Sequence, residues 1–393
     1  MRWMQRAEAA PPDARPTSRT QTLACRAIAV ALIAWFVSSV AGFYHPGTGF
    51  TSLIGFAAHD YEVPAMAQAP HFDAAAGYDG QFYAQLALVP FLTDPAIDRA
   101  LDNPPYRARR ILFSWTAYLI GLGRPAWILQ VYALQNVACW FVLAWVLMRW
   151  VSPDTPRGLA LWAACLFSQG LLVSVRLALT DGPSTLCLAL AAWAADRHRL
   201  WLTSAIVGMG ALGRETSLLG ISLLRMPRDR RGWLRTLMAL AVIMLPLLIW
   251  QDYLWSIYRT TSWTNQNLFA APFASMFHKW QVSIHAVARD GVRSPHMWAL
   301  AATLGLTVQA IFVATRTNYM DVWWRLAAPC VVLMAVLAWE VWAGIPGAAV
   351  RALLPMTIGF NVLLRDASRR SMWLWYGLGN IGLLHAPAVL HNG

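Results

Sequence analysis

PAWILQVYALQNVACWFVLAWVLM, residues 125–148, runs for 24 residues without a charged side chain between Arg124 and Arg149. About 20 apolar residues suffice for a helix to cross the hydrocarbon core of a bilayer, so this stretch predicts a membrane-spanning helix. Other predominantly apolar runs predict further spans, which begin at Ala27, Gly158, Thr236, Ser294, Val322, Gly347 and Ser371. The fold class that follows is an all-α, polytopic membrane protein.

The composition of the whole chain agrees with this class. Of the 393 residues, 58% are hydrophobic and only 13% are charged, which excludes a soluble domain of this length. The net charge of +12 comes from basic residues scattered in small groups between apolar runs. That pattern is typical of membrane topology, so no nucleic-acid partner is expected. The five cysteines lie in or beside apolar stretches without C-x-x-C spacing, which predicts neither a disulfide nor a zinc site.

The arginines predict the orientation of the chain. Residues 1–23 are interpreted as a retained cytoplasmic tail because they and the start of the first span carry Arg2, Arg6, Arg15, Arg19 and Arg26. The first span then runs outward, and residues 44–124 form a long external segment. Within it, residues 107–122 are too short between charges to cross, and they predict a helix lying in the interface. Had they crossed, the later basic clusters would face outward.

Two short apolar pieces, residues 200–213 and 216–224, flank Arg214 and Glu215. Neither is long enough to cross alone, so the pair predicts a hairpin whose charged tip faces a polar cavity or protein. The total is about 11 membrane helices with external loops at 44–124 and 259–295. We expect three parts: the tail, a membrane module at 24–256 that includes loop 44–124, and C-terminal membrane helices at 257–393.

The external segment holds most of the polar side chains that could carry chemistry. Its tightest group is GYDGQFY, residues 77–83, in which Asp79 is flanked by glycines and by Tyr78, Gln81 and Tyr83. Aromatic residues of this kind stack on sugar rings, although tyrosines are common at membrane interfaces in any case. Asp79 could equally cap a helix that begins at Gly80 or Gln81.

Each candidate cation has a structural alternative. Arg107 and Arg110 fall on one side of the interfacial helix and could only contact lipid headgroups. Arg176 could form an ion pair with Asp181, and Arg214 could neutralise Glu215. Arg351, within a span that begins outside, could pair with Glu340. Motifs of nucleotide-driven transporters and common hydrolases are absent from the sequence.

The order of five motifs resembles the GT-C superfamily of membrane glycosyltransferases, closest to bacterial cell-surface glycopolymer formation proteins. The motifs are GYDGQFY, NPPYRARRI, VRLALTDGPS, LGRETSLL and RALLP. The resemblance covers residues 24–225 well and the C-terminal half loosely. It implies that Asp79 is the catalytic base and that Asp181 is a second catalytic acid. Where relatives have a Lys-Gly pair at the hairpin tip, this chain has Arg214-Glu215.

The resemblance implies an inverting transfer of a sugar from a polyprenyl-phosphate donor to a glycan or glycolipid acceptor. Such a reaction needs a base for the acceptor hydroxyl and cations for the phosphate, which suits Arg176, Arg214 and Arg351. The expected location is a bacterial inner membrane, in contact with lipid, with the site on the periplasmic side. No cofactor is predicted, and a divalent metal is possible but not indicated. A lipid or solute transporter and a non-catalytic component of envelope polysaccharide assembly are the rival functions.

Overall fold

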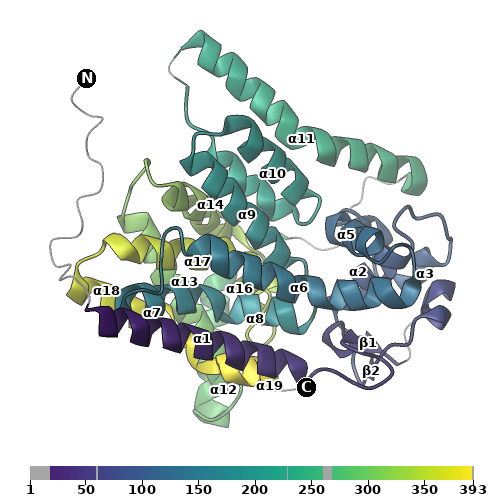
Figure 1. The fold of residues 1–393 in the computed structure, drawn as a ribbon, viewed down its shortest axis with the longest axis horizontal. Helices are drawn as coiled ribbons and strands as arrows, with labels where there is room; N and C mark the ends of the chain where they lie inside the picture. The colour runs from purple at the N-terminus through teal and green to yellow at the C-terminus, as the bar shows by residue number, and fades with distance from the viewer. Residues whose placement is uncertain (1–17, 59–60, 228, 260–267, 392–393) are drawn as a thin grey trace.

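A computed structural model describes residues 18–58, 61–227, 229–259 and 268–391. Most of the predicted tail therefore lies outside the described residues, as do residues 260–267 of the second external loop. The described chain is helical apart from two short strands, and its helices form a bundle with a smaller lobe at one end (Figure 1). The all-α prediction is confirmed.

Among the residues that the structure describes, four helices are long and apolar enough to cross a membrane: α1 (Arg19–Ala41), α6 (Pro125–Leu147), α11 (Arg230–Tyr258) and α13 (His296–Thr315). A fifth span is possible if α7 (Pro156–Leu166) and α8 (Gln169–Arg176) cross together despite a 45° bend. The protein is therefore polytopic, as predicted, whereas the count of about 11 membrane helices stays a prediction.

Several predicted spans are interrupted helices. The span expected from Gly347 consists of α16 (Ala349–Ala352) and α17 (Leu354–Leu363), with Pro355 in the first turn of α17. Proline lacks the N–H that a continuous helix would need there, which explains the break. The remaining elements of the C-terminal half are α12 (Ala274–Asp290), α14 (Val322–Val336), α15 (Trp339–Trp342), η4 (Leu364–Asp366), α18 (Arg369–Gly379), η5 (Ile381–His385) and α19 (Ala386–His391).

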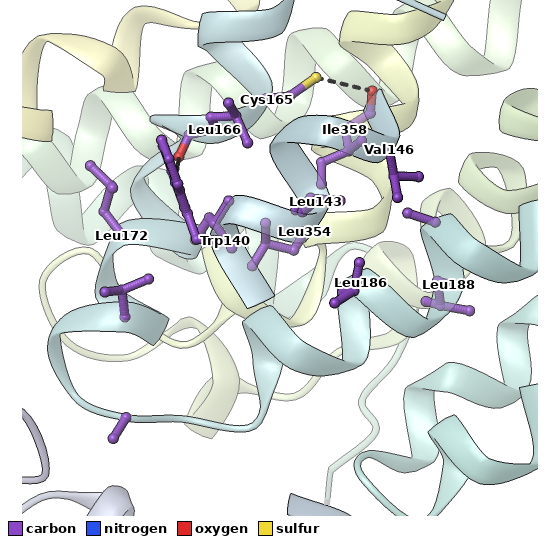
Figure 2. Close-up of a cluster of buried hydrophobic side chains, with 14 of the residues drawn as sticks. Trp140, Leu143, Val146, Cys165, Leu166, Leu172, Leu186, Leu188, Leu354 and Ile358 are labelled. Atoms are coloured by element: carbon purple, nitrogen blue, oxygen red, sulfur yellow. Dashed lines mark hydrogen bonds between the residues drawn. The ribbon is translucent and has the colours of Figure 1, made fainter. Parts of the chain in front are cut away.

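The centre of the bundle is an apolar core between α6, α7, α8, α9 (Asp181–Asp196) and α17. Figure 2 shows its side chains, including Trp140 of α6, Leu186 of α9 and Ile358 of α17. The Trp140 indole N–H donates to the Leu166 carbonyl at 2.9 Å, so the one polar atom of this ring is satisfied inside the core. This core fixes the start of α9, where Asp181 lies.

The predicted hairpin is confirmed as α10 (Leu200–Ala211) followed by the 3-10 helix η3 (Glu215–Leu223). It packs against α9 and α11. Gly208 permits the close approach to α11, because a Cβ there would lie 2.8 Å from the Ile243 carbonyl oxygen. The tip of the hairpin, with Arg214 and Glu215, is thereby held against the rest of the protein.

Residues 44–124, which the sequence predicts to be external, form the small lobe at one end of α6 (Figure 1). Its elements are η1 (Thr51–Leu53), β1 (Phe56–Ala57), η2 (Pro64–Gln68), β2 (Asp73–Ala74), α2 (Asp79–Leu88), α3 (Ile97–Ala100), α4 (Pro104–Ala108) and α5 (Leu112–Ile120). Strands β1 and β2 are parallel, with Phe56 opposite Asp73 and Ala57 opposite Ala74. The prediction of one interfacial helix over 107–122 is wrong in one respect. The helix is interrupted, because α4 ends at Ala108 and α5 begins at Leu112.

Candidate functional site

Asp79 is the first residue of α2, so the alternative in which it caps a helix that begins at Gly80 or Gln81 is wrong. The residue before the helix is Tyr78, which makes no side-chain capping bond. Gly80 allows the start of α2 to press between two loops, because a Cβ at this position would collide with the carbonyl oxygens of Leu177 and Ile54. The Asp79 carboxylate is therefore not occupied in capping, and it accepts a hydrogen bond from Arg107 at 2.9 Å.

The Asp79 side chain lines a pocket of about 530 Å³. The pocket is lined by Asp79, Asp102, Arg107, Tyr78, Gln81, Phe82, Gly77 and the alanines 57, 58, 75 and 76. The Asp79 side chain is 34% exposed, so a ligand in the pocket can reach its carboxylate. Gln81 stabilises the pocket wall. Its side-chain oxygen accepts a hydrogen bond from the Ala57 amide at 3.1 Å and so anchors β1.

Arg107 is the cation of this pocket, and Asp102 holds it in place. The Asp102 carboxylate accepts two hydrogen bonds from the Arg107 guanidinium, at 2.8 and 2.7 Å. Partial burial opposes ionisation of Asp102, but these bonds and the Arg107 charge hold its pKa below the ordinary value. The guanidinium also lies over the Phe82 ring, 4.7 Å from its centroid. Arg107 is thus buried and fixed in position, and contact with lipid headgroups does not explain it.

Behind the pocket lies a second, buried group of charges. Asp181, with a side chain only 1% exposed, pairs with Arg214 and with Arg351 at 3.3 Å. The same Arg351 nitrogen lies 4.0 Å from Asp79, and the other terminal nitrogen donates to the Tyr78 hydroxyl at 3.1 Å. Arg351 therefore joins the two acids that the sequence singled out. The alternative pair of Arg351 with Glu340 is wrong.

The hairpin tip contributes two opposite charges that go to different partners. Arg214 binds Asp181, whereas Glu215 accepts from Arg110 at 3.0 Å and lies 3.4 Å from Arg109. The alternative in which Arg214 and Glu215 only neutralise one another is wrong, because the backbone at Arg214 is extended. Successive side chains of extended backbone point in opposite directions.

Tyr83 connects Arg110, which pairs with Glu215 at the hairpin tip, to Arg107 in the pocket. Its hydroxyl accepts from Arg110 at 2.9 Å and from Arg107 at 3.4 Å. Arg110 also donates to the Tyr106 hydroxyl at 2.8 Å, which together with the Glu215 pair explains how this arginine is kept inside the protein. Tyr83 is therefore a buried link within the network, and its ring does not line the pocket.

Arg176 lies at the edge of the site. Its guanidinium donates to the Ser52 carbonyl at 3.2 Å and lies 4.4 Å from the centroid of the Phe43 ring. The expected ion pair of Arg176 with Asp181 is replaced by the pairs of Asp181 with Arg214 and Arg351. Arg176 instead links the end of α8 to the small lobe and the residues that lead into it.

Sequence reasoning did not single out Asp102, Tyr106, Arg109 or Phe82 as members of the site. The closeness of Asp102 and Arg107 in the chain was a usable signal, but the link from Arg109 to Glu215 spans more than 100 residues. The network that the structure describes contains four carboxylates and five guanidinium groups: Asp79, Asp102, Asp181 and Glu215 with Arg107, Arg109, Arg110, Arg214 and Arg351. One positive charge is in excess when all are ionised, which favours an anionic ligand.

Known proteins add little to what the geometry of the site indicates about the function of this chain. No protein-family model matches the chain, and no curated protein does. Among solved structures, the chain is similar to the crystal structure of ArnT from Cupriavidus metallidurans in the apo state, with 15% sequence identity and a TM-score of 0.48. The similarity covers 91% of this chain but 62% of that one, so this chain spans less than two thirds of the ArnT chain. A similarity at this level carries no argument about activity.

Proposed function

We propose that this chain is a membrane glycosyltransferase of the GT-C type, which moves a sugar from a polyprenyl-phosphate donor to a hydroxyl of a glycan or glycolipid. The observation that carries the proposal is the position of Asp79. Its carboxylate faces a pocket large enough for a sugar, and guanidinium groups flank it on two sides, Arg107 at 2.9 Å and Arg351 at 4.0 Å.

The chemistry of the transfer needs these two kinds of group. In the proposed step the acceptor oxygen attacks the anomeric carbon from the face opposite the phosphate. The new glycosidic C–O bond forms while the bond to the phosphate oxygen breaks, and the polyprenyl phosphate leaves with that electron pair. Asp79 takes the acceptor proton, and the excess positive charge of the network offsets the charge that develops on the phosphate.

Asp181 takes a different role in this proposal from the one that the family resemblance implied. It is enclosed and already holds Arg214 and Arg351, so it cannot reach an acceptor in the pocket. We assign it the positioning of both arginines, and through Arg351 the positioning of Asp79. The location proposed for the enzyme is a bacterial inner membrane, with the N-terminus in the cytoplasm and the pocket on the periplasmic side.

The test is a transfer assay on the purified full chain in lipid nanodiscs. A panel of polyprenyl-phosphate sugars is supplied with candidate glycan and glycolipid acceptors, and released polyprenyl phosphate is measured together with the glycosylated product. We expect release from at least one donor, dependent on Asp79. Binding of a donor without any release across the panel would favour a non-catalytic role in envelope polysaccharide assembly and contradict the proposal.

A further inference from the structure

Three metal-ligating side chains come together on the external lobe, apart from the charge network at Asp79. The His71 Nε2 atom lies 2.9 Å from a Glu62 carboxylate oxygen and 3.3 Å from an Asp73 carboxylate oxygen. Glu62 precedes η2, His71 follows it, and Asp73 begins β2, so one loop supplies all three. Their spacing in the sequence does not predict this cluster, because only the turn through η2 brings residues 62 and 73 together.

Each ring nitrogen of His71 has a distinct set of partners. Its Nδ1 atom lies 2.8 Å from the Ala69 carbonyl oxygen, which can only accept a hydrogen bond, so Nδ1 carries the hydrogen. The other nitrogen, Nε2, then points at two carboxylate oxygens. A lone pair in that position repels both, and either a proton or a metal cation must lie between them. A backbone carbonyl on the remote ring nitrogen is the usual support of a metal-bound histidine.

The distances suit a metal ion. With bonds of about 2.0–2.1 Å, neighbouring ligand atoms lie about 2.9 Å apart in octahedral geometry and about 3.4 Å apart in tetrahedral geometry. The two separations from His71, 2.9 and 3.3 Å, lie within this range, and the three ligand atoms all lie within 4.8 Å of one another. The Asp73 side chain is half exposed, so it can move the short distance needed to complete the coordination of an ion. We propose that Glu62, His71 and Asp73 bind one divalent ion of the zinc or manganese class, which accepts imidazole and carboxylate ligands together.

The place of this site gives the ion a structural effect. Asp73 is paired with Phe56 across the β1–β2 sheet, and the His71 ring packs 4.9 Å from the Phe56 ring. The next residues on the two strands, Ala57 and Ala74, lead directly into the pocket wall at 57–58 and 75–77. A bound ion would therefore tie the η2 loop to the sheet and stiffen the rim of the pocket.

The test is direct metal binding by the full chain in detergent, prepared without a polyhistidine tag and stripped with a chelator. Zinc chloride is titrated by calorimetry, manganese chloride in parallel, and the thermal unfolding midpoint is recorded with and without the ion. We expect one ion per chain and a higher midpoint. Asp73→Asn should weaken the affinity at least about tenfold, a typical loss when a metal site is disturbed, and His71→Gln should abolish binding.

His45→Gln is the matched control, because His45 stacks on Phe72 in the same lobe and lies outside the cluster. It should bind the ion as the unchanged chain does. If neither ion binds, or if Asp73→Asn and His71→Gln bind as tightly as the control, His71 holds a proton in an ordinary ion pair and the proposal is wrong. Asp73→Asn keeps the test valid if His71→Gln fails to fold. Binding is read without any transfer reaction, so the result is independent of the proposed function.

Discussion

Asp79 and Asp181 share Arg351 but lie in opposite surroundings. Asp79 is one-third exposed at the wall of a pocket, whereas Asp181 is enclosed and in contact with two guanidinium groups. A carboxylate that a ligand can reach is able to exchange a proton with it. A carboxylate enclosed by arginines keeps those arginines inside the protein, since an uncompensated buried charge is expensive. Two acids of equal standing in the sequence therefore lie in surroundings that suit separate tasks, the exposed Asp79 for proton transfer and the enclosed Asp181 for holding arginines.

Asp79→Asn is expected to have the largest effect, and on activity alone. Asparagine keeps the shape of the side chain but cannot accept the acceptor proton, so turnover should fall about 100- to 10,000-fold. Release of polyprenyl phosphate is the measurement, with donor binding and thermal stability recorded beside it. Asp94→Asn is the matched control: it makes the same change in the same lobe, outside the pocket, and should leave turnover near that of the unchanged chain. Equal turnover of both variants would remove Asp79 from the chemistry.

Asp181→Asn is expected to act on stability. It leaves Arg214 and Arg351 without their carboxylate, and removal of one partner of a buried ion pair typically costs about 3–5 kcal/mol. The unfolding free energy in detergent, or the amount of folded chain recovered from membranes, measures this loss. A variant with unchanged stability and strongly reduced turnover would instead make Asp181 the catalytic acid that the family resemblance implied.

Arg351→Gln, combined with each acid variant, measures how strongly the two regions are linked. Residues in direct contact show coupling energies of about 0.5–3 kcal/mol in double-mutant cycles. The shorter distance to Asp181 predicts a larger coupling in stability with Asp181→Asn than with Asp79→Asn. Equal couplings would mean that Arg351 serves both acids alike and would contradict a closer link to Asp181.

Asp102→Asn is expected to have the smallest effect, below about 1 kcal/mol, because the half-exposed carboxylate is screened by solvent. The pKa of Asp102 is lowered in the folded protein, so the group stabilises the fold above its ordinary pKa. This contribution is lost as the pH falls through the lowered folded value. The stability difference between Asp102→Asn and the unchanged chain should therefore be present at pH 7 and shrink on acidification. A difference that stays constant with pH would show that Arg107 does not depend on this charge.

The positions of the membrane helices could be predicted from the sequence more completely than the contacts within the site. Uncharged length alone located the long spans α1, α6, α11 and α13, and the short pieces around Arg214 located the hairpin. The site residues came from local motifs, and the structure brings nearly all of them into one network. Their partners were predicted less well, since the pairs proposed for Arg214, Arg176 and Arg351 all joined residues close in the chain. The structure instead joins Arg214 to Asp181 and Arg110 to Glu215.

The sequence by itself determined that this chain is helical and lies in a membrane, because the cost of placing charge and unpaired backbone in hydrocarbon is set by composition and segment length. It also showed which charged side chains lie within or beside apolar segments and therefore need oppositely charged or hydrogen-bonding partners. Only the tertiary structure decided which charges meet, because those contacts form between segments far apart in the chain whose relative positions depend on the packing of α6, α9, α10 and α16. The difference between an accessible Asp79 and an enclosed Asp181 is a property of that packing.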